Sequence, residues 1–163
     1  MKRRDLQRWL QFPNVLAFLK AIRLGEGTSG QNGYYTLFGG QPFLEVDTHP
    51  AVRFYETHDE FIRNGKLDYT TAAGAYQITY STWRRLCKLY PFTDFSPQTQ
   101  DEMAVALIAG RGALENIKAG QLATAVSKCA GEWASLPGST AGQRTESYAA
   151  VEKVYVDAGG VLA

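Results

Sequence analysis

The amino-acid sequence predicts an α+β fold, with a mainly helical body and a small β-hairpin lobe inserted after the first helix. Two observations predict it. Helical periodicity occupies the first segment and the whole second half of the chain. Residues that favour strands and tight turns are confined to the middle, between residues 34 and 70. This segregation of helices and strands is typical of α+β proteins, and it places a cleft between the body and the lobe.

Length and composition narrow the classes of protein. We expect residues 1–163 to form a single domain, in which residues 1–14 are a basic extension that leads into the first helix. A net charge of +1 gives no overall attraction to nucleic acid. Basic residues do cluster at positions 2–8 and 84–88. They form either a solvated face or a surface attracted to an anionic partner such as the bacterial envelope.

The first helix carries the most informative residue, Glu26. Pro13 suits the first turn of this helix, and Gly27 suits its end. Glu26 continues, at helical spacing, a stripe of apolar side chains formed by Val15, Phe18, Leu19 and Ile22. A carboxylate in such a position is either paired or held there for chemistry. Partial burial and the negative end of the helix dipole would both raise its pKa, as a general acid requires.

Two short hairpins are predicted in the middle of the chain. Residues 34–38 favour a strand that ends at the turn Gly39-Gly40, with residues 43–46 as its partner. A second hairpin turns at Asn64-Gly65, between residues 61–63 and 66–69. The lobe that they form would meet the helical body beside Glu26, where a long polymer could lie across the cleft.

The second half of the chain predicts further helices. One covers residues 82–90 with Ser81 as its cap, and the next opens at Ser96-Pro97. Another carries an apolar stripe from Leu122 to Trp133, and a last helix precedes Gly159-Gly160. No apolar run is long enough to span a membrane, and no secretory signal is found. We therefore expect synthesis in the cytoplasm, with a separate agent of release if the protein acts elsewhere.

The sequence contains no motif that indicates a metal site, a redox site or a nucleotide-binding site. Cys87 and Cys129 lack CxxC spacing. They are either two small buried side chains or, if their helices pack side by side, one disulfide. His49 and His58 lack the spacing of a metal-ligand pair, and no phosphate-binding loop is present. We expect neither a metal nor a cofactor.

Three clusters of small, polar and aromatic residues could surround Glu26: residues 27–33, 71–78 and 133–143. Hydroxyls, amides and aromatic faces bind sugars, because a sugar ring offers apolar C–H faces rimmed by hydroxyl groups. The candidates for substrate binding are Thr28, Ser29, Tyr34, Tyr76, Gln77 and Gln143. The alternative is structural: Tyr76 and Trp133 would be core residues, and the two glutamines would be ordinary polar residues unless they face the cleft.

A set of short motifs recurs in register across residues 15–160. They are Glu26-Gly27-Thr28, Gly33-Tyr34, Phe38-Gly39-Gly40, His49-Pro50, Gly74-Ala75-Tyr76-Gln77, Asp94-Phe95-Ser96-Pro97, Gln100-Asp101, Arg111-Gly112-Ala113-Leu114, Trp133-Ala134-Ser135-Leu136-Pro137-Gly138 and Gly142-Gln143. In these motifs the chain resembles the bacteriophage lambda endolysin family, which are lytic transglycosylases of lysozyme-like fold. The resemblance implies a single lysozyme-like catalytic domain.

The resemblance also implies a reaction. Glu26 would be the catalytic acid that cleaves the β-1,4 bond between N-acetylmuramic acid and N-acetylglucosamine in a peptidoglycan glycan strand. The same carboxylate would then take the proton of the muramic C6 hydroxyl as that oxygen attacks C1. The product is a 1,6-anhydro ring, and no water is consumed. One carboxylate could therefore suffice where most glycosidases use a pair.

Two positions depart from the family pattern. Tyr35 stands where the family has an aspartate, and Ala141 stands where it has a sugar-contacting tyrosine. The basic segment before residue 15 is also longer than the start of the family member. The loss at Ala141 predicts weaker sugar contacts, but neither departure touches Glu26.

Other functions remain open at this point. A hydrolytic muramidase would need a second carboxylate, for which Glu45, Asp47 and Asp68 are candidates. A non-catalytic wall-binding module could keep the same fold. The resemblance implies a monomeric endolysin, made in the host cytoplasm, released through a holin and acting in the periplasm. A virion-associated lysozyme would have the same sequence features.

Overall fold

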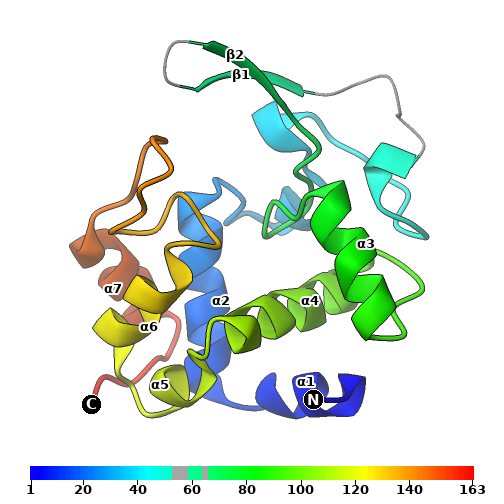
Figure 1. Cartoon of the computed structure of the whole chain (residues 1–163). Coiled ribbons are helices and arrows are strands. Elements are labelled where there is room, and N and C mark those ends of the chain that lie inside the picture. Colours follow the sequence, from blue (N-terminus) through cyan, green and yellow to red (C-terminus); the bar gives the residue numbers. More distant parts are fainter. Residues whose placement is uncertain (53–58, 64–65) are drawn as a thin grey trace.

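The computed structural model describes residues 1–52, 59–63 and 66–163, with the backbone alone over residues 59–63 and 66–69, and it is mainly helical (Figure 1). In chain order the elements are α1 (Arg3–Trp9), α2 (Pro13–Gly25), η1 (Gln31–Tyr35), η2 (Phe38–Gly40), η3 (Pro50–Val52), β1 (Asp59–Arg63), β2 (Lys66–Thr70), α3 (Tyr80–Leu89), α4 (Pro97–Gly110), α5 (Leu114–Lys118), α6 (Leu122–Cys129) and α7 (Tyr148–Asp157). The three η elements are 3-10 helices.

Helix α2 forms as the sequence predicts, from Pro13 in its first turn to a stop at Gly25. Its apolar stripe is buried, with Phe18 and Ile22 fully inaccessible. The helix packs against α7 and α5, so its far end presents Glu26 at the edge of the core. The position of Glu26 at the predicted cleft is therefore determined by where α2 ends.

Helix α4 is the buried centre of the body (Figure 1). It begins as predicted at Ser96-Pro97, where the Ser96 hydroxyl accepts a hydrogen bond from the Thr99 amide. Side chains around the whole circumference of this helix are buried, as expected for a helix surrounded by other elements. It contacts α1, α3 and α5.

Three helical predictions need correction. Helix α3 begins at Tyr80, and its cap is Thr79 rather than Ser81, because the Thr79 hydroxyl accepts from the Thr82 amide. Helix α6 ends at Cys129, so Trp133 lies in the turns beyond it although its side chain is buried. The short helix α5 was not predicted.

The predicted strand at residues 34–38 is wrong. Residues 31–35 and 38–40 form 3-10 helices, and two isolated bridges pair Thr36 with Pro42 and Leu37 with Ala73. The carbonyl of Tyr34 is bonded to the Gln100 side chain instead of a neighbouring strand, and Gly39 and Gly40 have positive φ angles of 82° and 92°. These tertiary contacts override the local preference for a strand.

Strands β1 and β2 are antiparallel, and Phe61 lies opposite Asp68. They cover the residues predicted for the second hairpin, although its turn at residues 64 and 65 lies outside the described residues. A lobe of two β-hairpins is nevertheless not supported, because 3-10 turns replace the first of them. The fold is better described as a helical body with this region above it (Figure 1).

The basic extension at residues 1–14 folds into α1 and the start of α2. Leu6 is fully buried, and α1 packs on α4. Arg3 donates from Nε to Glu102 Oε2 at 2.5 Å, and Glu102 is completely buried. Gln7 also donates to Glu102, at 2.9 Å. The extension is thus part of the body, attached through a buried carboxylate.

Both cysteines are free thiols, so the disulfide alternative is not realised. Cys129 is buried and Cys87 partly buried. Within the described residues, no helix has the length and apolar character needed to cross a lipid bilayer.

The Arg3–Glu102 pair generates a stability prediction. Arg3→Met should lower the free energy of unfolding by about 2–3 kcal/mol, because it leaves a buried carboxylate without its cation. Urea denaturation would measure this loss. The double variant Arg3→Met/Glu102→Gln should recover part of the stability, since it removes both charges. A single variant as stable as the wild type would contradict the role assigned to the pair.

Candidate active site

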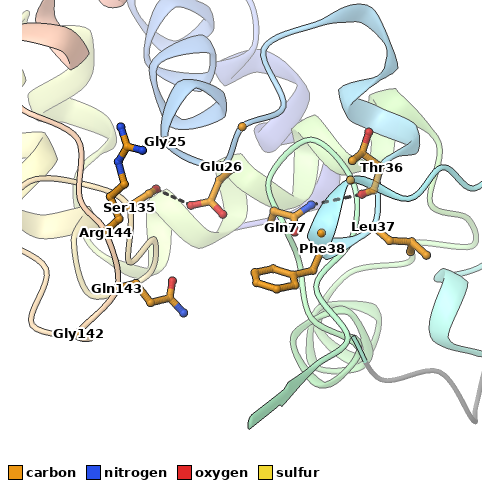
Figure 2. Close-up of a pocket in the computed structure, with 13 residues that line it drawn as sticks. Gly25, Glu26, Thr36, Leu37, Phe38, Gln77, Ser135, Gly142, Gln143 and Arg144 are labelled. Atoms are coloured by element: carbon orange, nitrogen blue, oxygen red, sulfur yellow. Dashed lines mark hydrogen bonds between the residues drawn. The ribbon is translucent and has the colours of Figure 1, made fainter. Parts of the chain in front are cut away.

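A cleft of about 550 Å³ lies at the C-terminal end of α2. Figure 2 shows Glu26 on one wall, with Phe38 and Gln77 across from it and Gln143 below. Its wall is made by the end of α2, the 3-10 turns at residues 36–40, Gln77, Ser135 and residues 142–144. Segments far apart in the sequence therefore meet around one carboxylate.

The carboxylate of Glu26 is hydrogen-bonded to a neutral side chain, that of Ser135. Ser135 Oγ donates a hydrogen bond of 2.5 Å to Glu26 Oε1. Burial raises the pKa of Glu26 above the usual glutamate value, and the Ser135 hydrogen bond lowers it in part. The predicted direction of the pKa is confirmed, with burial as the main cause. A partly desolvated carboxyl of this kind can hold a proton near neutral pH and release it to a substrate.

Gly25 makes the Ser135 contact possible. A Cβ atom at this position would lie 2.4 Å from Ser135 Oγ and 2.7 Å from its Cβ. Any other residue would push Ser135 away from the carboxylate. The need for glycine at position 25 could not be predicted from the sequence, because it arises from contact with Ser135, which lies far along the chain.

The opposite wall is built around Gln77. This residue has a positive φ of 48°, which is uncommon for any residue except glycine. Its Nε2 donates to the carbonyl oxygens of Gly74 at 3.0 Å and Thr36 at 3.3 Å. These bonds fix the side chain on the cleft wall, where a backbone outlier is a recurrent sign of function.

The remaining wall comes from the loop after Trp133. Gln143 and Arg144 are exposed and line the cleft, and Arg144 is the one cation among the described residues of its lining. An adjoining cavity of about 230 Å³ shares Glu26, Phe38, Gln77 and Gln143 with the cleft and extends toward Glu132 and Trp133. The two cavities therefore adjoin along the wall that carries Glu26.

Four of the predicted binding residues lie elsewhere. Thr28 is buried, and its hydroxyl donates to the Ala75 carbonyl at 2.6 Å. Ser29 is exposed but does not line the cleft. Tyr34 and Tyr76 line a separate cavity beside α2. Of the predicted side chains, the structure therefore gathers Glu26, Gln77 and Gln143 and leaves these four outside.

Tyr34 and Tyr76 are hydrogen-bonded to Asp101, a carboxylate of α4. Their hydroxyls donate to the same oxygen of Asp101, Oδ1, at 2.8 Å and 2.5 Å. Burial and then the negative charge of Asp101 raise the pKa of Tyr34 to about 12 and that of Tyr76 well above its usual value. Burial also raises the pKa of Asp101, against the two hydrogen bonds that lower it. The polar atoms of both tyrosines are thus satisfied inside the protein.

A hydrolase would need a second carboxylate beside Glu26, and none of the candidates is shown to line the main cleft. Glu45 and Asp47 are exposed and lie outside the lining of both cavities. Asp68 is on β2, where the backbone alone is described. Glu132 lines the adjoining cavity but pairs with Arg111, from Nη2 to Oε2 at 2.8 Å. Among the residues whose side chains the structure describes, Glu26 is therefore the one carboxylate that lines the main cleft.

The sequence missed Ser135, Phe38 and Arg144 as members of the site. Ser135 lies in the cluster at residues 133–143 and Phe38 in the segment predicted as a strand, but no local pattern marks either residue as part of the site. Among the described residues, no group of three His, Cys, Asp or Glu side chains could hold a metal ion. His49 is buried, with Nε2 at 2.8 Å from the Ile78 carbonyl, and burial lowers its pKa to about 4.

Known proteins match nearly the whole chain. A family model described as Endolysin matches residues 16–162. The endolysin of Escherichia phage P2 is 38% identical over 160 residues, which cover 92% of this chain and 95% of the relative. The endolysin of Escherichia phage lambda is 33% identical over 152 residues, covering 90% and 91%. A solved structure, bacteriophage lambda lysozyme complexed with a chitohexasaccharide, has a TM-score of 0.80 at 30% identity over 93% of this chain and 97% of that one.

Ser135→Ala should raise the pKa of Glu26 further. The Ser135 hydrogen bond stabilises the ionised carboxylate, so its loss favours the protonated form. Carbon-13 NMR titration of the glutamate carboxyl groups would measure the shift. Ser139→Ala is the matched control, because this serine lies in the neighbouring loop and bonds to Ala141. An unchanged or lowered pKa in Ser135→Ala would contradict the role of the hydrogen bond.

Proposed function

The chain belongs to the endolysin family, and from this we propose that it is a peptidoglycan lytic transglycosylase. The resemblance read from the sequence is confirmed, and so is the lysozyme-like, mainly helical fold. A relative of this fold has been solved with a chitohexasaccharide. We infer that the cleft of this chain takes a peptidoglycan glycan strand, whose backbone is likewise a β-1,4 chain of amino sugars.

Glu26 acts first as a general acid. Burial raises its pKa above the usual glutamate value, which favours the protonated form that donates. With the scissile bond across the cleft, the proton passes to the glycosidic oxygen, and the bond to C1 breaks with positive charge developing on the sugar ring. The departing proton leaves Glu26 ionised and hydrogen-bonded to Ser135, which stabilises this form of the enzyme.

Glu26 then acts as a base. The ionised carboxylate accepts the proton of the muramic C6 hydroxyl while that oxygen attacks C1 and closes the 1,6-anhydro ring. The observation that carries this proposal is that Glu26 is the one carboxylate lining the main cleft within the described part of the chain. An inverting hydrolase would need a second carboxylate at a suitable distance to activate water, and a retaining one would need a second carboxylate as nucleophile.

Hydrolysis is the second candidate reaction. Glu132 favours it, because this carboxylate lines the cavity that adjoins the cleft. Its ion pair with Arg111 argues against a role as a base, since two hydrogen bonds from the guanidinium to Oε2 hold this carboxylate on a partner within the protein. We therefore favour the single-carboxylate reaction.

The biological setting follows from the family. We propose that the protein is a monomeric phage endolysin, made in the host cytoplasm, released through a holin and active on the peptidoglycan of the periplasm. Gln77 and Gln143 are the predicted binding residues that remain in this proposal, joined by Phe38 on the opposite wall.

Product analysis distinguishes the two reactions. We expect wild-type enzyme to release 1,6-anhydro muropeptides that are one water lighter than hydrolysis products and that take up no label from water enriched in heavy oxygen. Glu26→Gln should cleave about 10³-fold more slowly with an unchanged fold, because it removes both proton transfers. Mass spectrometry of digested sacculi measures both outcomes.

Glu132→Gln is the matched control, since it removes the other carboxylate of the cleft region. It should keep most of the activity. Reducing ends that carry the heavy oxygen, together with an inactive Glu132→Gln variant, would assign hydrolysis instead. Full activity in Glu26→Gln would contradict both reactions.

A further inference from the structure

Basic residues are concentrated on α1 and α3. Residues 2–9 and α3 together hold seven of the 17 Lys and Arg residues, but one of the 16 Asp and Glu residues, Asp5. The rest of the chain is therefore acidic overall, although the whole protein has a net charge of +1. Such segregation creates a local positive potential that the net charge conceals.

Helix α3 is amphipathic, and its polar face is basic. Leu86 is buried against the core, while Arg84, Arg85 and Lys88 are exposed. No Asp or Glu occurs in the helix to neutralise them. Leu89 follows on the same exposed side with 65% of its surface accessible. Clustered Lys and Arg side chains are attracted to the anionic lipids of a membrane surface.

Helix α1 continues this basic surface. The side chains of Arg4 and Arg8 are 68% and 75% exposed, and Asp5 neutralises them in part, at 4.0 and 3.7 Å. Arg3 points inward to Glu102 and also joins the two helices, because its Nη1 donates to the carbonyl of Pro91 at 3.0 Å, just beyond α3. Met1 adds a second exposed apolar side chain. We define the α1–α3 surface as Met1, Lys2, Arg4, Arg8, Arg84, Arg85, Lys88 and Leu89, on two helices that this contact links.

The position of this surface suits a role apart from catalysis. Helix α1 precedes the first residue of α2, and Glu26 follows the last, so the two lie about 20 Å apart along the helix. Figure 1 shows α1 at the end of the body opposite the C-terminal end of α2. Helix α1 also lies outside residues 16–162, the part matched by the family model.

We propose that the α1–α3 surface docks on a bilayer of anionic phospholipid. Lys and Arg side chains would contact phosphate groups, and Met1 and Leu89 would enter the headgroup region. With α1 against the bilayer, Glu26 would lie at the opposite end of α2, away from the lipid. The docking would hold the enzyme in the narrow space between membrane and peptidoglycan and would raise its local concentration there. This inference does not depend on which reaction Glu26 performs.

Sedimentation with lipid vesicles tests the proposal. The full-length protein should bind vesicles of phosphatidylglycerol and phosphatidylcholine, with affinity that falls as salt is added, and should not bind phosphatidylcholine alone. Arg85→Gln/Lys88→Gln should weaken this binding about 30-fold, since each charge near the surface contributes about fivefold. Lys20→Gln/Lys153→Gln is the matched control, because it removes two exposed charges outside the surface and should bind as the wild type does.

Three outcomes would overturn the proposal. One is equal binding of both double variants to anionic vesicles, which would mean that the net charge of the protein, and not this surface, determines the binding. Another is equal binding to neutral and anionic vesicles. The third is binding to duplex DNA, lost in Arg85→Gln/Lys88→Gln, without binding to anionic vesicles, which would identify a nucleic-acid surface. Circular dichroism and thermal unfolding of each variant would ensure that lost binding is not lost folding.

Discussion

The hydrogen bond from Ser135 to Glu26 is the contact on which the site depends. Burial at the end of α2 raises the pKa of Glu26, and the single hydrogen bond at 2.5 Å keeps the ionised form accessible. A residue that donates a proton and then accepts one needs both forms within reach. A cation beside Glu26 would lower its pKa and favour the ionised carboxylate. A wholly apolar pocket would raise the pKa and favour the protonated acid. Gly25 preserves this balance, since a Cβ there would collide with Ser135.

Helix α4 holds the walls that face this carboxylate. Gln100 is fully buried, accepts from the Ala75 amide at 2.8 Å and donates to the Tyr34 carbonyl at 2.9 Å. It thereby ties the loop that carries Gln77 to the 3-10 turn before Phe38. Asp101, the next residue, receives the hydroxyls of Tyr34 and Tyr76. Polar residues that looked like sugar contacts in the sequence instead fix the positions of those that do line the cleft.

Local patterns predicted the parts of the fold that local interactions determine. Pro13 and Ser96-Pro97 marked the starts of α2 and α4, and Glu26 stood out because a carboxylate interrupted an apolar stripe. The strand predicted at residues 34–38 failed because the Gln100 side chain, 66 residues from Tyr34, takes its carbonyl. Ser135 is 109 residues from Glu26, so no helical or strand period could connect them. The acid could therefore be found from the sequence, while its partner and the opposite wall could not.

The central claim is that one partly buried carboxyl performs both proton transfers. Its most direct test compares the pH dependence of kcat/KM for glycan cleavage with the titration of Glu26 followed by NMR. Because Glu26 must carry a proton to begin the reaction, we predict that the rate falls as the pH rises through the pKa of Glu26, and that this pKa lies above the usual glutamate value. A rate that stays constant well above that pKa, or a Glu26 that titrates like an exposed glutamate, would contradict the claim.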